Sequence, residues 1–177
     1  MAELKDLYNE LGLTDAYISS LRLPKFKEET KLVLIEVGPD GKEKLLASTA
    51  AQSWAALKSK AQSDGVTLFT YSAFRSFELQ YELIKERLRK GESLEQVLQR
   101  LAAPGFSEHH TGRAVDVTCP TFPHPTQEFD QSIEFNWLTE NASEFKFSLS
   151  YPKGNTTGIM YEPWHWCFRG VLENKKL

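Results

Sequence analysis

An aspartate inside an otherwise apolar strand pattern is the feature that most limits how this chain can fold. In "GRAVDVT", residues 112–118, the alternation predicts a strand that carries Ala114 and Asp116 on one face. Burying a carboxylate costs free energy unless a positive group pairs with it. The fold must therefore bring an arginine or a metal ion to this strand.

Two histidines could share a metal ion with Asp116. His109 lies seven residues earlier, across Gly112, which permits the tight bend that would return the imidazole to the strand. His165 lies far downstream in "EPWHW", a segment that its proline makes extended. Zinc binds imidazole nitrogen and carboxylate oxygen, and a catalytic site uses three protein ligands plus a water position. The alternative interpretation of His165 is a core histidine packed between two tryptophans.

Two further side chains have the chemistry of a hydrolytic zinc site. Glu162 stands three residues before His165, where a carboxylate that is not a ligand could take a proton from water and pass it to the leaving amine. Arg75 lies at a predicted strand-to-helix junction, and is either a surface arginine or a group that binds a substrate carboxylate or oxyanion. His110 and His124 are interpreted as surface residues or as support for the ligands.

The order of predicted elements is that of an α+β protein with a mostly antiparallel sheet. Helices come first, strands gather late, and the two do not alternate regularly. Periodicity predicts helices over residues 2–11, 15–23, 50–64, 76–90, 93–102 and 130–145. Strands are predicted over residues 31–37, 42–48, 66–72, 112–118, 146–151, 157–162 and 164–168, the first two forming a hairpin around "GPDG".

Several residues predict where helices begin and end. Gly12 and Gly65 follow the last periodic residues of two helices and are typical stops. Either Ser48 or Thr49 is expected to cap the helix that begins near residue 50. "SLEQ", residues 93–96, predicts a capping box at the start of another helix.

Length and charge narrow the class of protein. With 177 residues the chain is long enough for one domain with a real core, so residues 1–177 are expected to form a single domain. A net charge of −3 gives no reason to expect nucleic acid or an anionic membrane surface as a partner. Cys119 and Cys167 are too few for a disulfide scaffold and are expected to be reduced and partly buried.

Neither a membrane span nor a signal peptide is apparent in the sequence. Every apolar stretch falls short of the roughly 18 residues that cross a bilayer, and the N-terminus is charged and amphipathic. We therefore expect a cytoplasmic protein, or a periplasmic or extracellular one if a leader has been removed.

Together these residues resemble the VanY-type D-alanyl-D-alanine carboxypeptidases, zinc peptidases of a group that includes lysostaphin-type enzymes and the hedgehog signalling domain. The family's S-x-H-x-x-G-x-A-x-D motif is matched from Ser107 to Asp116, and its E-P-W-H motif by residues 162–165. "SAFRSFELQ" is similar to the family's S-G-Y-R-S-x-x-x-Q. The match spans roughly residues 45–170, and residues 1–44 form a helical and hairpin extension without a counterpart.

The resemblance implies a hedgehog-like peptidase fold, with helices packed on a central sheet, and one bound zinc ion. It implies that His109, Asp116 and His165 are the metal ligands and that Glu162 is the general base and then the acid. It also implies that Arg75 holds the substrate or the transition state. The residues implied to lie near the terminal carboxylate of the substrate are Ser107 and Gln80.

The implied reaction is hydrolysis of the last peptide bond of a peptidoglycan stem peptide, which releases D-alanine. The enzyme would be a D,D-carboxypeptidase acting on a pentapeptide or an L,D-carboxypeptidase acting on a tetrapeptide. A chain without a leader would meet recycled peptides, which favours L,D activity, and we expect a monomer. The alternatives are an L-alanyl-D-glutamate endopeptidase of the same fold and a non-catalytic zinc-binding interaction domain.

The chain departs from the family pattern at two places. "SAF" replaces "SGY" beside Arg75, and Cys167 stands where the family usually has an arginine. Cys167 would share a strand face with His165, so a thiolate role is conceivable. Three apolar residues are left open between lining a cleft and filling the core: Phe106, Phe122 and Trp137.

Overall fold

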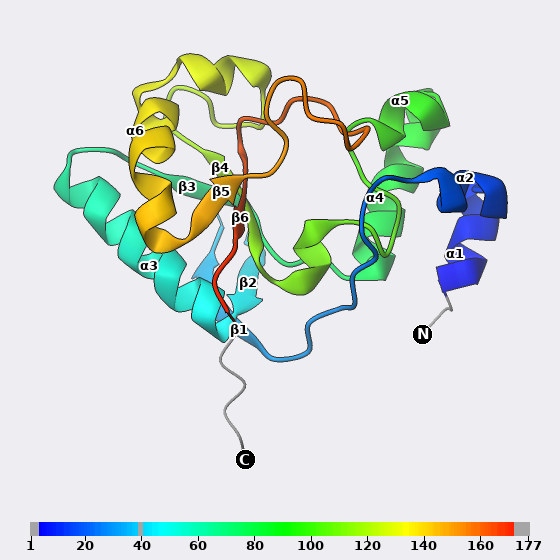
Figure 1. Ribbon diagram of the computed structural model, residues 1–177, viewed down its shortest axis with the longest axis horizontal. Coiled ribbons are helices and arrows are strands. Elements are labelled where there is room, and N and C mark those ends of the chain that lie inside the picture. Colours follow the sequence, from blue (N-terminus) through cyan, green and yellow to red (C-terminus); the bar gives the residue numbers. More distant parts are fainter. Residues whose placement is uncertain (1–3, 39–40, 172–177) are drawn as a thin grey trace.

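The computed structural model describes residues 4–38 and 41–171, and it contains both helices and strands (Figure 1). The α-helices are α1 (Leu4–Leu11), α2 (Asp15–Ser20), α3 (Ser48–Ser63), α4 (Phe77–Arg89), α5 (Leu94–Leu98) and α6 (Ile133–Asn141). The strands are β1 (Leu32–Val37), β2 (Glu43–Ala47), β3 (Phe69–Ser72), β4 (Ala114–Thr118), β5 (Phe147–Leu149) and β6 (His165–Phe168). Short 3₁₀ helices are η1 (Glu108–Thr111), η2 (Gln127–Gln131) and η3 (Ala142–Phe145).

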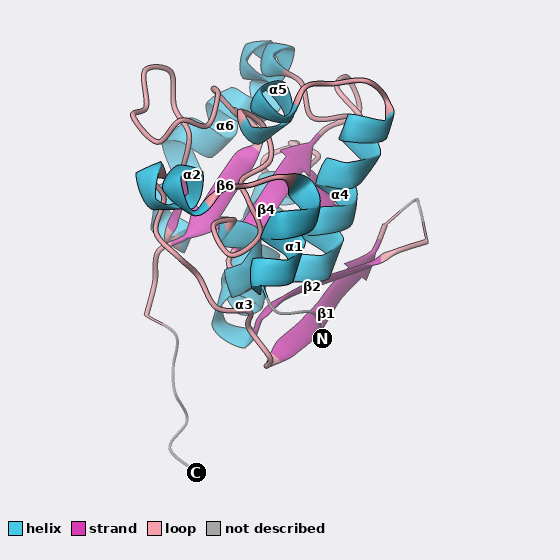
Figure 2. Ribbon diagram, turned by 90° about the vertical axis from the view of Figure 1, so that its right-hand side faces the viewer, coloured by secondary structure: helices cyan, strands magenta, loops and turns pink. Residues whose placement is uncertain are grey.

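The strands form two antiparallel sheets, which confirms the predicted α+β class. β1 and β2 form the predicted hairpin. The other sheet has the order β3-β4-β6-β5, and each neighbouring pair in it is antiparallel. In this sheet β4 and β6 lie side by side although they are far apart in the sequence, and Asp116 lies opposite His165 in their register. Figure 2 shows α1, α4 and α5 in front of these two strands.

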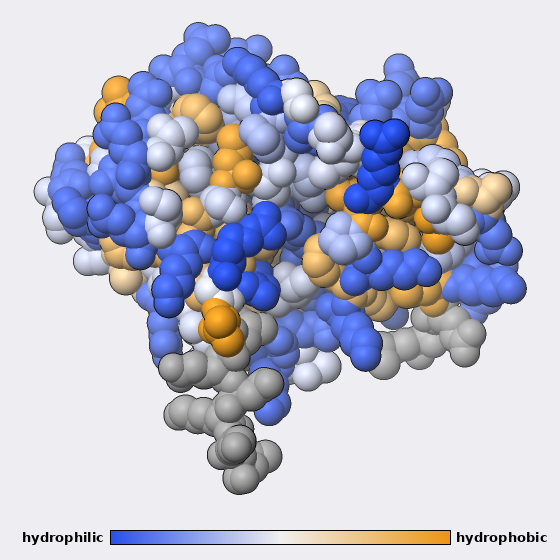
Figure 3. All heavy atoms as spheres, viewed as in Figure 1, coloured by the Kyte–Doolittle hydropathy of each residue, from blue (hydrophilic) through white to orange (hydrophobic). Residues whose placement is uncertain are grey.

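Two clusters of buried apolar side chains hold the elements together. The first, which we call the sheet core, packs α3 and α6 onto the four-stranded sheet, with Trp54, Leu57, Val115, Leu138 and Phe168 among its members. The second, which we call the helical core, joins α1, α2, α4 and α5, with Leu7, Leu11, Ile18, Ile84 and Val97 among its members. Figure 3 shows that apolar side chains remain partly exposed over the helical side of the molecule.

The three aromatic residues that the sequence left open between a cleft and the core all pack against the two buried clusters. Phe106 belongs to the helical core and Trp137 to the sheet core, and both are buried. Phe122 is partly buried and packs against the sheet core. All three therefore contribute to the packing of the fold.

The segment between α2 and the hairpin runs across the molecule and is tied to the loop before β4. Figure 1 shows this segment as a blue loop that descends from α2 towards β1. The Phe26 N–H donates to the Gly105 carbonyl at 2.7 Å, and the Glu29 N–H donates to the His110 carbonyl at 2.8 Å. The N-terminal segment is thus bonded directly to the loop that carries His109 and His110.

Most predicted helix ends agree with the structure, but one cap was wrong. Gly12 follows directly after the end of α1, and the capping box at Ser93 is present. Neither Ser48 nor Thr49 caps α3: the helix begins at Ser48, and Ala47 is the residue before it. The Ala47 N–H donates to the Gly112 carbonyl at 2.8 Å, so the chain enters the helix directly from β2.

The helix predicted over residues 93–102 ends at Leu98, and two other predicted elements are absent or divided in the structure. The strand predicted over residues 157–162 is absent from the described chain, where Asn155 accepts hydrogen bonds from the Thr157 N–H and hydroxyl and so folds the segment into turns. The long helix predicted over residues 130–145 is divided into η2, α6 and η3 because Ser132 caps a new helix by accepting from the Phe135 N–H.

In the part of the chain that the structure describes, no helix has both the length and the apolar character needed to cross a bilayer.

Candidate metal and catalytic site

His109 is placed by a short 3₁₀ turn that ends in a glycine. The Ser107 hydroxyl accepts from the His109 N–H at the start of η1, and Gly112 ends it with a φ of 61°. A Cβ at Gly112 would lie 2.8 Å from Leu32 Cδ2 and 2.9 Å from Ala47 N, so a larger residue would clash with the hairpin. The bend predicted at Gly112 is present, and it turns His109 back towards β4.

Asp116 and His165 face each other across two neighbouring antiparallel strands. Asp116 Oδ1 lies 3.1 Å from His165 Nδ1, and Asp116 Oδ2 lies 3.2 Å from His109 Nε2. One ligand atom from each of the three residues lies within 4.8 Å of the other two, and all three residues are buried. The structure thus brings together the three residues that the sequence singled out as metal ligands.

The outward-facing nitrogen of each imidazole has its own hydrogen-bond acceptor. His109 Nδ1 lies 2.6 Å from the Ala73 carbonyl, just after β3, and His165 Nε2 lies 3.0 Å from Glu108 Oε2. A histidine that donates from one nitrogen presents a lone pair at the other, which is how protein ligands are oriented towards metals. The two histidines therefore point His109 Nε2 and His165 Nδ1 at the Asp116 carboxylate.

The charges within this cluster are strongly perturbed. Burial, together with the nearby Arg75 guanidinium, lowers the pKa of His109 to about 4. Burial would also lower the pKa of His165, but hydrogen bonds to Asp116 and Glu108 outweigh it and raise that pKa to about 10. Burial would raise the pKa of Asp116, yet the charges of His109 and Arg75 hold it well below its usual value. A buried carboxylate is therefore compensated by several positive or hydrogen-bonding groups.

The donor set fits a zinc ion. Two imidazole nitrogens and one carboxylate are the ligands that catalytic zinc sites use. The Arg75 guanidinium also donates to Asp116 Oδ2, so the arginine that could have paired with Asp116 is present as well. The sequence predicted either an arginine or a metal ion as the partner of Asp116. The structure places Arg75 and a candidate metal position beside the same carboxylate.

Glu162 lies beside the cluster and is buried, with 5% of its surface exposed. Its Oε2 is 3.9 Å from His165 Nδ1, and its backbone carbonyl accepts from the His165 N–H at 3.1 Å. Burial raises the pKa of Glu162 to about 8, although the His165 charge acts in the opposite direction. A carboxyl group with such a pKa can both take up and release a proton near neutral pH.

Arg75 lies at the site rather than on an open surface. Its side chain is 12% exposed, its Nε donates to Ser72 Oγ at 2.8 Å, and its backbone N–H donates to the His109 carbonyl at 3.3 Å. These contacts fix the guanidinium next to Asp116. A second group on the substrate side could reach the same guanidinium, which carries five donors.

Gln80 lies deeper than the sequence interpretation implies. It is 1% exposed on α4, where Nε2 donates to the Ala102 carbonyl at 2.8 Å. Its Oε1 is the buried side-chain atom that has no hydrogen-bond partner among the described residues. Ser107 is also buried, and its hydroxyl accepts from the His109 N–H at 3.4 Å. Contact of either side chain with a substrate stays a prediction.

The two remaining histidines differ in position. His124 is exposed, whereas His110 is fully buried, with Nδ1 2.7 Å from the Arg75 carbonyl and Nε2 accepting from the Gly105 N–H at 3.1 Å. Of the two interpretations given to His110, a surface residue is wrong and a supporting residue agrees with these contacts. His110 ties the backbone of Arg75 to the loop before β4.

Sequence reasoning missed two residues that contact His165. Glu108 accepts from its imidazole, and the Tyr151 ring lies 4.9 Å from the imidazole ring. A signal for Glu108 was present, because an acidic residue next to a predicted ligand in an otherwise buried stretch needs a partner. Nothing in the sequence around Tyr151 indicates its position.

Cys167 is a buried thiol on β6, opposite Ala114. Burial raises its pKa to about 12, with the Glu108 charge acting in the same direction. A thiol that is this hard to ionise is poorly suited to the thiolate role considered from the sequence. The expected reduced state agrees with the structure, in which Cys119 is a buried free thiol too.

Comparison with protein families gives a match over most of the chain. The model described as VanY, D-alanyl-D-alanine carboxypeptidase, matches residues 43–171. A putative carboxypeptidase of Bacillus subtilis (strain 168), YodJ, is 30% identical over 156 residues, which are 84% of this chain and 56% of the relative. A D-alanyl-D-alanine carboxypeptidase of Enterococcus faecalis is 33% identical over 127 residues, 66% of this chain and 46% of the relative. The chain thus spans about half the length of the curated relatives it matches.

Solved structures of similar fold include an LD-carboxypeptidase and two VanY structures. The LdcB LD-carboxypeptidase has a TM-score of 0.71 and 27% identity, with 83% of this chain and 72% of that chain covered. VanYB in complex with D-alanine-D-alanine has a TM-score of 0.63 and 28% identity, covering 86% and 83%. A mutant of the vancomycin resistance D,D-pentapeptidase VanY in complex with Zn(II) has a TM-score of 0.61 and 29% identity, covering 80% of each chain.

Proposed function

Since the chain belongs to the VanY family of D-alanyl-D-alanine carboxypeptidases, we propose that it is a zinc-dependent carboxypeptidase that removes the C-terminal D-alanine from peptidoglycan stem peptides. The observation that carries the proposal is the meeting of His109, Asp116 and His165 in one buried cluster beside Glu162. The VanY structure with Zn(II) and the VanYB structure with D-alanine-D-alanine support the choice of metal and of substrate class.

His109, Asp116 and His165 would hold one zinc ion. When bound there, zinc supplies Lewis-acid polarisation of a carbonyl group and makes water acidic enough to react near neutral pH. The Ala73 carbonyl, 2.6 Å from His109 Nδ1, would keep His109 Nε2 turned towards the ion.

Glu162 would move the proton. Its carboxylate would take a proton from the attacking water and deliver it to the nitrogen of the departing D-alanine. The raised pKa of about 8 supports this assignment, because the acid form is stable enough to donate. A nearby cation favours the ionised form of a carboxyl group and would bring Glu162 closer to the state that accepts a proton.

Arg75 would hold the substrate. The guanidinium is fixed by Ser72 and Asp116 at the edge of the cluster, and a guanidinium binds carboxylates and oxyanions through paired hydrogen bonds. Its role in the substrate complex would be to stabilise the negative charge on the terminal carboxylate or the reacting carbonyl. Contacts of Ser107 and Gln80 with the terminal carboxylate belong to the same proposal.

Of the two possible substrates we favour the tetrapeptide, cleaved by L,D-carboxypeptidase activity. The TM-score to the LdcB LD-carboxypeptidase, 0.71, is higher than the values to the VanY structures named above, 0.61 and 0.63. The curated relative from Enterococcus faecalis, named a D-alanyl-D-alanine carboxypeptidase, supports D,D activity on a pentapeptide as the second candidate.

One experiment tests these assignments together. The purified protein is incubated with stem tripeptide, tetrapeptide and pentapeptide, with and without zinc, and product masses are recorded. Loss of one alanine from the tetrapeptide is the expected result, and loss of one from the pentapeptide would favour the second candidate. Cleavage inside the stem would indicate an endopeptidase, and zinc binding without any product would indicate an interaction domain. A chelator should abolish the alanine release, and added zinc should restore it.

A further inference from the structure

The imidazole of His165 lies between two carboxylates. Its Nδ1 is 3.1 Å from Asp116 Oδ1, and its Nε2 is 3.0 Å from Glu108 Oε2. Asp116 is one of the three converging residues, whereas Glu108 lies on the far side of the ring from the position where a metal would bind. His109, in contrast, has a neutral backbone carbonyl on its outer nitrogen. The two histidines are thus supported by different chemistry.

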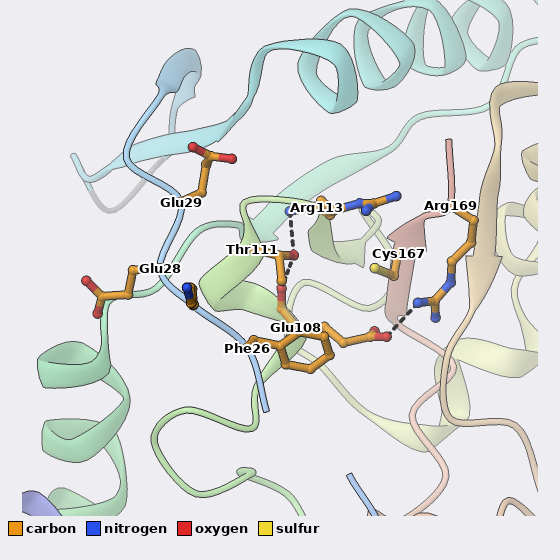
Figure 4. Close-up of a pocket in the computed structure, with 9 residues that line it drawn as sticks. Phe26, Glu28, Glu29, Glu108, Thr111, Arg113, Cys167 and Arg169 are labelled. Carbon is orange, nitrogen blue, oxygen red and sulfur yellow. Dashed lines mark hydrogen bonds and ion pairs between the residues drawn. The ribbon is translucent and has the colours of Figure 1, made fainter. Parts of the chain in front are cut away.

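The Glu108 carboxylate is itself held in place by other side chains. Arg169 Nη1 donates to Glu108 Oε1 at 2.7 Å, and the Ser150 hydroxyl donates to Glu108 Oε2. Arg169 also donates to Ser150 Oγ at 2.9 Å and to Ser148 Oγ at 3.1 Å, and so joins β5 to the end of β6. Figure 4 shows the Glu108 side chain extending towards Arg169, with Cys167 beside them on β6.

A plain surface ion pair does not account for this arrangement. The Glu108 side chain is 11% exposed while that of Arg169 is 49% exposed, so an anion has been taken largely out of water. Burying a carboxylate costs free energy, and an ion pair with a half-exposed arginine offsets little of that cost. The His165 imidazole adds further stabilisation, because it contacts the same Oε2 atom that accepts from the Ser150 hydroxyl. Burial would raise the pKa of Glu108, but these contacts hold it below its ordinary value.

We propose that Glu108 is a positioning residue for the third metal ligand: it accepts a hydrogen bond from the Nε2–H of His165 and so fixes the ring with the Nδ1 lone pair towards the metal. The inference rests on the proposed function, because it concerns the zinc site assigned there. Arg169 and Ser150 act through Glu108 by holding its carboxylate. Partners of this kind orient a ligand and increase its basicity, and their removal typically weakens metal binding by about 10- to 100-fold.

The test measures zinc binding rather than turnover. Glu108→Gln removes the charge while keeping the length of the side chain, and the zinc dissociation constant is measured by competition with a chromogenic chelator. We expect it to rise about 10-fold. The matched control is Glu134→Gln, which neutralises another buried carboxyl group, near Cys119, and should leave zinc affinity unchanged. The visible spectrum of the cobalt-substituted protein should shift for Glu108→Gln and stay as in the parent for the control.

The role of Arg169 is tested in the same assay. Since its ion pair is half exposed, Arg169→Met should weaken zinc binding less, by about threefold. Because Arg169 acts through Glu108, the double variant should bind zinc as Glu108→Gln alone does. Effects that simply multiply would overturn the proposed relay from Arg169.

The outcomes separate this inference from the proposed function. A parent protein that binds no zinc would refute the proposed function itself. A parent that binds zinc, with Glu108→Gln folded and binding within twofold of it, would overturn the positioning role and leave the metal site intact. If Glu108→Gln fails to fold, Arg169→Met decides, and an unchanged dissociation constant would overturn the inference.

Discussion

Glu162 is a carboxyl group that the fold buries beside a metal-binding cluster without making it one of the converging residues. Its Oε2 lies 3.9 Å from His165 Nδ1, and its surface is 5% exposed. A carboxyl group in such a place destabilises its own charged form, which is why its pKa is raised to about 8. The same burial that costs stability when the group ionises gives it a proton to exchange.

Replacement of Glu162 should separate metal binding from turnover. Glu162→Gln removes the proton carrier but none of the three ligands, so zinc content should stay at one ion per chain while alanine release falls about 10²- to 10⁴-fold. Zinc content is measured by metal analysis and release by mass spectrometry. Glu144→Gln, on the exposed surface of η3, is the control. Turnover that survives in Glu162→Gln would contradict the assigned role.

The raised pKa of Glu162 also predicts how the stability of the metal-free protein depends on pH. Between the ordinary value of 4.5 and about 8, the folded state holds a proton on Glu162 that the unfolded chain has released. Its contribution to stability is therefore complete below pH 4.5 and is lost as the pH rises through 8. Each unit by which the pKa is raised corresponds to about 1.4 kcal/mol.

The measurement compares unfolding of the parent and Glu162→Gln in the presence of a chelator from pH 5 to pH 8. The free energy of unfolding of the parent should fall relative to that of the variant as the pH rises, because glutamine cannot ionise. Glu144→Gln, at an exposed position, is the control for the substitution itself. A parent and a Glu162→Gln protein with parallel pH profiles would show that burial does not perturb this carboxyl group.

The site depends on the short turn η1 and on the pairing of β4 with β6. Gly112 ends η1 in the left-handed region at a φ of 61°, against the end of β2. Its carbonyl accepts from the Ala47 N–H at 2.8 Å, so the hairpin holds the turn in position. The turn and the hairpin are therefore expected to move together when either is disturbed.

A pair of glycine substitutions separates backbone strain from this close contact. Gly65 has a φ of 78°, and a Cβ added there would lie in open space. Gly65→Ala should therefore lower the free energy of unfolding by about 1–2 kcal/mol through backbone strain alone. Gly112→Ala carries the same kind of strain and also meets Ala47 N at 2.9 Å, so it should cost a further 1–3 kcal/mol. Denaturant unfolding gives both values, and zinc affinity should fall only in Gly112→Ala. Equal losses at the two positions would mean that the contact with the hairpin is unimportant.

The helical core joins the N-terminal helices to the region that matches the family. Leu7 and Leu11 of α1 pack in one cluster with Tyr81 and Ile84 of α4. The Tyr8 hydroxyl donates to the Pro104 carbonyl at 2.8 Å, close before η1 in the sequence. These contacts support the proposal that the chain forms one domain, and they join α1 to the loop that precedes the metal site.

A substitution in α1 should therefore weaken the distant sheet core. Leu11→Ala empties a buried position and should lower the free energy of unfolding by about 2–5 kcal/mol. Tryptophan fluorescence reports the loss, because all four tryptophans of the chain lie in the sheet core. The control Leu79→Ala, at an exposed position on α4, should change the free energy of unfolding by less than about 0.5 kcal/mol. An unchanged fluorescence transition in Leu11→Ala would mean that the two cores unfold separately.

Local patterns predicted most of the elements, and they failed where a longer-range contact decided the outcome. The helices at α1 and α4 and the strand at β4 follow from periodicity, which depends only on near neighbours. The predicted cap of α3 was wrong because the Ala47 N–H donates a hydrogen bond to the carbonyl of Gly112, in a distant loop. The depth of Gln80 and of His110 was likewise not visible, since burial depends on what packs over a residue.

Local sequence is enough to predict the chemical types at the site and the bend at Gly112 that turns His109 towards β4. An aspartate in an apolar strand must be paired, and Gly112, five residues after the start of the motif at Ser107, permits the turn, whatever the rest of the chain does. Which groups complete the cluster depends on contacts between distant parts of the chain. The contact between Glu108 and His165 joins residues 57 positions apart, and it exists because β4 pairs with β6 in one particular register. Strand pairing is a property of the whole fold, so no local pattern could specify it.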